Sequence, residues 1–107
     1  KAFGIQDLRK KRIRTTTLTN LLKKRRIKKI DFMNIDIEGH EFEVLKTLNF
    51  KHFDIKVICI EIINYDFYSR NIKINKNKIF KILRKNSYTL KFKSVINYIF
   101  VKNENKI

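Results

Sequence analysis

The segment Ile35–Glu41 gathers ionisable side chains in one short stretch of an otherwise basic chain. Asp36, Glu38 and His40 occupy every second position there. A carboxylate or a neutral imidazole can take a proton from a hydroxyl group near neutral pH, and a positioned base of this kind typically accelerates a reaction by about 10²–10⁴-fold. The residue types therefore suit an enzyme that activates a hydroxyl group before it attacks.

The sequence around these residues predicts a strand, an acidic turn and a helix. An apolar run from Ile30 to Ile35 precedes the acids, and an amphipathic segment from about His40 to Leu48 follows them. Open α/β sheets build their ligand sites at the carboxyl ends of strands, which is where this turn would lie. We expect Gly39 to permit a backbone conformation that a side chain would oppose, so its role is to shape the turn.

A second strand is predicted over residues 56–63, apolar on both faces, and its apolar run from Val57 to Ile63 is interrupted by Glu61. A charge in an apolar strand is costly unless it is paired or lies at the solvent edge. We therefore place Glu61 at the mouth of a cleft, beside Asp36. The alternatives are that Glu61 pairs with a nearby lysine, and that Asp36 or Glu38 only satisfies free amides at the helix start. For His40, the alternative is a surface histidine without a chemical role.

The rest of the chain completes an α/β pattern. A helix capped by Thr16 or Thr17 carries Leu18, Leu21 and Leu22 on one face. A further helix is predicted over 76–85, and two alternating strands over 88–93 and 96–102. The tight connection between these last strands requires an antiparallel pair. The strand-helix-strand order predicts that the strands near 31–36 and 57–63 are adjacent and parallel, with the closing strand antiparallel beside the second.

Four segments resemble, in the same order along the chain, the FkbM family of methyltransferases. They are residues 16–22, 31–48 with the acidic turn, 56–62 and 97–101. The resemblance implies a partial Rossmann-like methyltransferase sheet, mostly parallel, with a terminal antiparallel hairpin. It also implies S-adenosylmethionine as cofactor and a hydroxyl of a glycan or secondary metabolite as acceptor. On this basis Asp36, Glu38 and His40 are candidate catalytic residues, and Glu61 and Asn64 are candidate substrate-binding residues.

The family's cofactor loop is rich in glycine, whereas this chain has only Gly4 and Gly39, far apart. We therefore interpret residues 1–107 as the C-terminal part of one FkbM-like methyltransferase domain, whose N-terminal cofactor-loop half is absent. Removing half of a sheet would leave one strand edge and one apolar face uncovered. An inactive methyltransferase remnant is an alternative interpretation for the same reason.

The net charge of +16 raises a different possibility, a basic nucleic-acid-binding module. We favour compositional bias instead, because Ile and Asn are abundant together with Lys and all three have A/T-rich codons. Seven of the ten acidic residues nevertheless fall between positions 31 and 61, which indicates a local need for carboxylates.

Other classes of site and location receive little support from the sequence. The lone Cys59 is expected to be an inert buried thiol, and the two histidines lack zinc-ligand spacing, so we predict no metal site. No signal peptide or bilayer-spanning run is present, and we expect a cytoplasmic location. The oligomeric state is left open.

Overall fold

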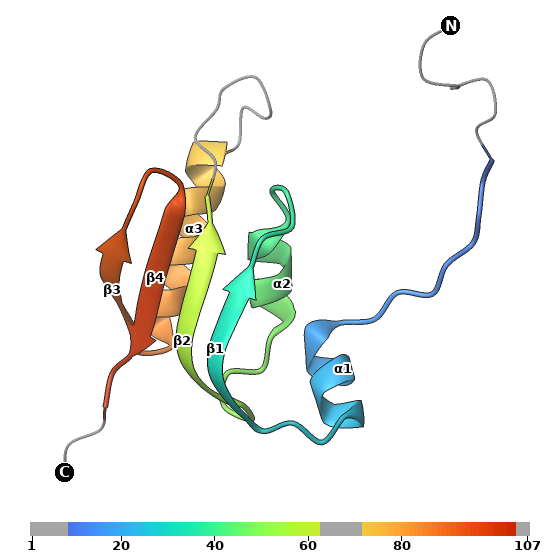
Figure 1. The fold of residues 1–107 in the computed structure, drawn as a ribbon, viewed down its shortest axis with the longest axis horizontal. Helices are drawn as coiled ribbons and strands as arrows, with labels where there is room; N and C mark the ends of the chain where they lie inside the picture. Colours follow the sequence, from blue (N-terminus) through green and yellow to red (C-terminus); the bar gives the residue numbers. More distant parts are fainter. Residues whose placement is uncertain (1–8, 63–71, 105–107) are drawn as a thin grey trace, which may run out of the picture.

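Two layers make up the protein, a four-stranded sheet and helices packed on one of its faces (Figure 1). The computed structural model describes residues 9–62 and 72–104. Its elements, in chain order, are α1 (Leu18–Lys24), β1 (Lys29–Ile35), α2 (Glu41–Thr47), β2 (Asp54–Glu61), α3 (Ile72–Lys85), β3 (Tyr88–Lys93) and β4 (Asn97–Lys102). Each predicted helix and strand of these segments is present, with bounds shifted by a few residues.

The strands follow the order β1-β2-β4-β3. β1 and β2 are parallel neighbours, and β4 lies antiparallel beside β2, so this part of the predicted arrangement is confirmed. The prediction of a mostly parallel sheet was wrong, because β1–β2 is the single parallel pair among the described strands and β4 pairs antiparallel with both neighbours. After α3, the chain forms β3 at the outer edge of the sheet. The short connection after Lys93 then leads into β4, which lies between β3 and β2.

Every second side chain along the central strands points toward the helices, and these side chains form the hydrophobic core. Ile58 and Ile60 of β2 pair with Phe100 and Tyr98 of β4, and all four are buried. Phe80 of α3 packs edge-to-face against both aromatic rings, at centroid distances of 5.6 Å to Tyr98 and 5.4 Å to Phe100. The sheet and the helices behind it are therefore held by one apolar layer.

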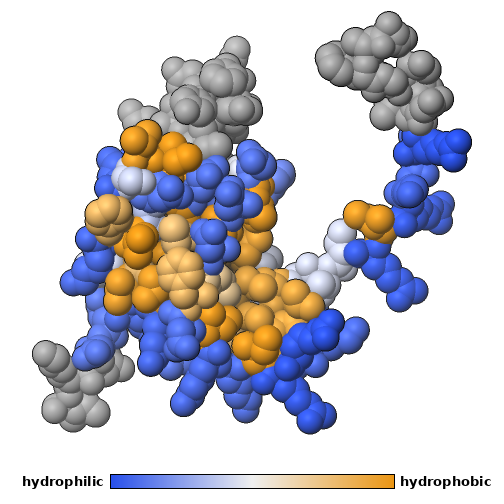
Figure 2. All heavy atoms as spheres, in the orientation of Figure 1, coloured by the Kyte–Doolittle hydropathy of each residue, from blue (hydrophilic) through white to orange (hydrophobic). Residues whose placement is uncertain are grey.

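The other face of the sheet carries no helix within the described residues (Figure 1). Phe32 of β1 lies in register with Val57 of β2, and Phe92 of β3 with Ile99 of β4, so these side chains point to this face. Phe32 and Phe92 are 57% and 60% exposed. Apolar side chains accordingly gather on the face shown in Figure 2.

Helix α1 lies beside the β1 edge of the sheet (Figure 1). Thr17 caps α1, as predicted, because its side chain accepts a hydrogen bond from the Asn20 amide (3.1 Å). In the described part of the chain, no helix is long and apolar enough to cross a membrane.

Candidate functional site

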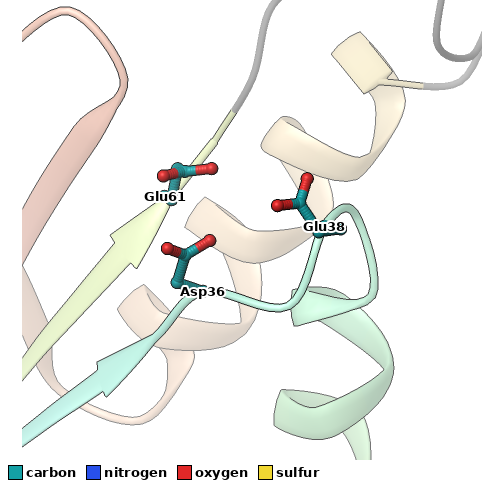
Figure 3. A group of neighbouring side chains, drawn as sticks. All are labelled: Asp36, Glu38 and Glu61. Atoms are coloured by element: carbon teal, nitrogen blue, oxygen red, sulfur yellow. The ribbon is translucent and has the colours of Figure 1, made fainter.

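Asp36, Glu38 and Glu61 converge at the carboxyl edge of the parallel strand pair (Figure 3). One carboxylate oxygen from each lies within 4.8 Å of those of the other two. The sheet register explains this arrangement: Ile35 is the partner of Ile60, so Asp36 and Glu61 follow directly at the ends of neighbouring strands. The predicted position of Glu61 beside Asp36 is therefore confirmed as geometry.

Two consecutive left-handed residues bring Glu38 back toward the strand ends. Glu38 has φ 55° and Gly39 has φ 95°. A Cβ atom placed on Gly39 would meet nothing within 4 Å. The glycine is thus required by the backbone conformation alone, not by a close neighbour, in agreement with its predicted role in the turn.

The turn is held by a different acid, Glu41. Its side chain is buried, and Oε2 accepts hydrogen bonds from the amides of Ile37 (2.8 Å) and Gly39 (3.4 Å). A carboxylate in the first turn of α2 is also favoured by the positive end of the helix dipole. Because Glu41 serves these amides, and no described amide donates to Asp36 or Glu38, the amide-capping alternative for those two residues loses its main support.

Burial and the neighbouring acids make Glu61 harder to ionise. The pKa of Glu61 is above its ordinary value, first because of burial and then because of the charge of Asp36 and a hydrogen bond to it, with smaller effects from Glu38 and Glu41. Among the described side chains, no lysine or arginine forms an ion pair with Asp36, Glu38 or Glu61. Pairing with a nearby lysine, the alternative for Glu61, is thus not found in the described residues.

His40 lies apart from this group. It is exposed, it precedes α2 at the N-cap position, and its side chain makes no capping hydrogen bond. The structure does not include it with the three carboxylates, so its catalytic role stays a prediction. Asn64 lies outside the described residues. Cys59 is partly rather than fully buried, and burial raises the pKa of its thiol, which fits an unreactive side chain.

The described residues offer oxygen ligands for a metal ion but no glycine-rich loop for a cofactor. Three carboxylate oxygens at this spacing match the chemistry of a hard cation such as Mg²⁺ or Ca²⁺, although exposed acid groups are common without an ion. The absence of a metal therefore stays a prediction. For S-adenosylmethionine, Gly39 is the one glycine in the described part, and the space around it is open. Whether these residues bind S-adenosylmethionine by themselves therefore stays a prediction.

A parallel strand pair with acidic side chains at its carboxyl edge is typical of α/β enzymes. The family model described as the methyltransferase FkbM domain matches residues 2–99, most of the chain, and the protein belongs to this family. No curated protein and no solved structure matches it. Membership indicates methyl transfer in general, with a methyl-donor cofactor and a small-molecule acceptor.

Proposed function

We propose that this chain carries the acceptor side of a methyl-transfer site and that the acceptor is a hydroxyl-bearing glycan or secondary metabolite. The observation that supports the proposal is the cluster of Asp36, Glu38 and Glu61, which has no cation partner among the described residues. In a chain with 26 lysines and arginines, a purely structural acid cluster would be neutralised easily. An acceptor with several hydroxyl groups can instead donate hydrogen bonds to the free carboxylate oxygens.

The unequal environments of the carboxylates suggest their roles. Asp36 and Glu38 are exposed, while Glu61 is partly buried and has a raised pKa. Neighbouring acids in different environments can take different roles. Asp36 would accept the hydroxyl proton as the oxygen attacks, while Glu61 would accept a hydrogen bond from a second hydroxyl group of the acceptor. Glu38 would orient the substrate, and Asn64 would assist through its amide.

His40 is assigned a subordinate role in this proposal. Its imidazole lies two residues after Glu38, on the exposed side of the turn. A neutral imidazole there would pass the proton on to solvent near neutral pH, after a carboxylate has taken it.

The methyl donor in this proposal is S-adenosylmethionine, the cofactor that resemblance to the family implies. Because residues 1–107 contain only two glycines, a glycine-rich cofactor loop of the kind the family has would come from outside them. The residues of this chain would align the acceptor and exclude water, and alignment accounts for much of the rate in such substitutions.

The test is transfer of a labelled methyl group from S-adenosylmethionine to hydroxylated acceptors, measured on this chain and on any longer polypeptide that contains it. Asp36→Asn and Glu61→Gln are expected to lower turnover per folded molecule by at least about tenfold, the lower range of effects for a positioned base. Glu43→Gln is the matched control, because Glu43 is an exposed acid of α2 that pairs with Lys46 (3.3 Å). Unchanged turnover in the first two variants would remove the assignment.

A second candidate function, binding of single-stranded nucleic acid, gains one observation from the structure. Phe32 and Phe92 are exposed on the open sheet face of a strongly basic chain, and aromatic side chains on such a face can stack on bases. The aliphatic residues between them and the absence of arginine from the four described strands favour packing instead. A salt-dependent oligonucleotide affinity that is lost in Phe32→Ala would reverse this preference.

A further inference from the structure

A cluster of cations joins α1 to β1, at the end of β1 opposite the acidic site. Six of the seven residues from Lys23 to Lys29 are lysine or arginine, and all seven are exposed. We call residues 23–29 the basic turn. Among the described residues, none of its cations forms an ion pair. An A/T-rich composition sets the number of cations in this chain, but the fold decides that these six lie together.

The backbone of the basic turn is fixed by two hydrogen bonds. The Arg26 amide donates to the Lys23 carbonyl (3.0 Å), and the Ile27 amide donates to the Leu22 carbonyl (2.9 Å). This pair of bonds defines a Schellman motif at the end of a helix. Arg26 occupies the left-handed position of the motif with φ 58°, where glycine is the usual residue. Because a side chain is unfavourable in this conformation, fold stability alone would not select an arginine there.

Ile27 gives the basic turn an apolar centre. It lies between Arg26 and Lys28, and it is 38% exposed. Cations around an exposed apolar side chain match the surface of an anionic bilayer, where phosphate groups lie above acyl chains. The backbone of a nucleic acid offers phosphates without an apolar layer, and the basic turn has no aromatic side chain that could stack on bases. A bilayer therefore fits this surface better than a nucleic acid does.

The neighbouring acids leave the basic turn with an excess of positive charge. Asp54 is the register partner of Lys29, but its carboxylate pairs with Lys102 (3.1 Å). Lys102, more than Lys56 or Lys29, holds the pKa of Asp54 below its ordinary value. Asp31 follows two positions after Lys29, is exposed and forms no ion pair with a described residue. One unpaired acid is too few to neutralise six cations.

The acidic site lies too far away to weaken this charge. Asp36 follows the seven residues of β1, so it lies about 23 Å from the basic turn at the usual rise of a strand. Figure 1 shows the arrow of β1 pointing away from α1's end and toward the acidic turn. Charges are screened over about 8 Å in physiological salt. A negatively charged surface would thus attract one end of the molecule and orient the acidic site away from itself.

We propose that the basic turn binds the surface of a bilayer that contains anionic phospholipids. Its lysines and arginines contact the phosphate groups, and Ile27 enters the boundary between headgroups and acyl chains. Apolar contact and attraction to anionic lipids together set the strength of such binding. Each cation near the surface changes the affinity by about fivefold. The proposal does not depend on methyl transfer.

The test is co-sedimentation of the 107-residue chain with vesicles of phosphatidylcholine, with or without phosphatidylserine. Binding is expected with phosphatidylserine and should weaken as salt is added. Arg26→Gly should weaken it by about fivefold without lowering the melting temperature, because glycine adopts φ 58° freely. Arg25→Gln, at a right-handed position, should lose about as much, and it replaces Arg26→Gly if that variant does not fold by circular dichroism. Ile27→Ser should weaken binding at unchanged net charge.

Lys91→Gln is the matched control. It removes the same charge from an exposed residue of β3, which lies three strand spacings from β1, about 14 Å. Its binding should stay close to that of the parent chain. Equal losses in Lys91→Gln and Arg26→Gly would show that binding follows net charge alone and would overturn the proposal. Binding to neutral vesicles as tight as to anionic ones would also overturn it. So would tighter binding, in the same salt, to a single-stranded oligonucleotide through Arg26.

Discussion

Replacement of Glu61 by glutamine is expected to stabilise the protein at pH 7. The carboxylate lies near those of Asp36 and Glu38 and has no described cation partner. Glutamine keeps nearly the same shape and removes the charge, so repulsion with both neighbours disappears. An acid that binds substrate at a cleft edge is expected to be costly in this way, because functional groups are often retained at the expense of stability.

The spacing of the carboxylates sets the size of the effect. Two unit charges 4.8 Å apart repel each other by about 1 kcal/mol in a medium as polar as water, before screening by salt. Asp36 and Glu38 are exposed, so a water-like value is the appropriate one. A gain of about 1 kcal/mol raises the melting temperature of a domain of roughly 100 residues by about 4–8 °C.

The sign of the pH dependence follows from the raised pKa of Glu61. The folded state holds this proton more tightly than the unfolded chain, whose pKa stays near the ordinary 4.5. Ionisation therefore destabilises the fold as pH rises above that value, and the cost is complete once pH exceeds the folded pKa. The advantage of Glu61→Gln should be largest at pH 7, decrease as pH falls below the folded pKa, and vanish below the ordinary value of 4.5. Added salt should reduce it.

Thermal unfolding followed by circular dichroism, at low and high salt and at pH 7 and pH 3.5, measures all of these effects. Glu43→Gln is the control, because its exposed ion pair with Lys46 should leave the melting temperature nearly unchanged. A clear decrease in melting temperature for Glu61→Gln at pH 7 would refute the reasoning. It would mean that a cation compensates the carboxylate in solution, and that Glu61 has a structural role.

Three further predictions concern the turn, a buried tyrosine and the cofactor. Gly39→Ala should cost about 1–2 kcal/mol in urea unfolding, because φ is 95° there, whereas Glu38→Gly should cost less, since it removes a side chain from φ 55°. Tyr88 donates a hydrogen bond to the Ile55 carbonyl, and burial, with the charge of Asp54, raises its pKa to about 12. Absorbance at 295 nm should show its step near pH 12, and Tyr88→Phe should remove that step; ionisation in the ordinary range would contradict the burial argument. Calorimetry should show weak or no binding of S-adenosylmethionine to this chain alone, and tight stoichiometric binding would show that these residues suffice.

The strand-helix-strand unit that positions the three carboxylates could be predicted from the sequence. An apolar run before Asp36 and a second one ending in Glu61 were enough to predict two parallel neighbours, because a strand-helix-strand connection is almost always a parallel crossover. Once the strands were parallel neighbours, their acidic ends had to meet. The convergence of the carboxylates is thus a consequence of local patterns and one topological rule.

Other features depend on contacts that no local pattern reveals. The place of β3 at the outer edge of the sheet depends on where α3 returns the chain, and Phe80 of α3 packs on Tyr98 and Phe100 of β4. The buried role of Glu41 depends on the left-handed turn that directs the amides of Ile37 and Gly39 toward it. In the sequence, neither Phe80 nor Glu41 can be told apart from an ordinary residue on the face of a helix.

The distribution of acids in this basic chain gives the argument its final step. Glu41 secures the turn, Glu43 pairs with Lys46, and Asp54 pairs with Lys102, with the Lys102 side chain lowering the pKa of Asp54. Each of these acids is stabilised by a partner. Asp36, Glu38 and Glu61 have no ion-pair partner among the described residues, and unlike Asp31 and Glu104, which also have none there, they lie close together. Glu61 also resists ionisation. Fold stability alone would not select this arrangement, so a ligand that hydrogen-bonds to free carboxylates is the better explanation, and a methyl acceptor is the one that family membership favours.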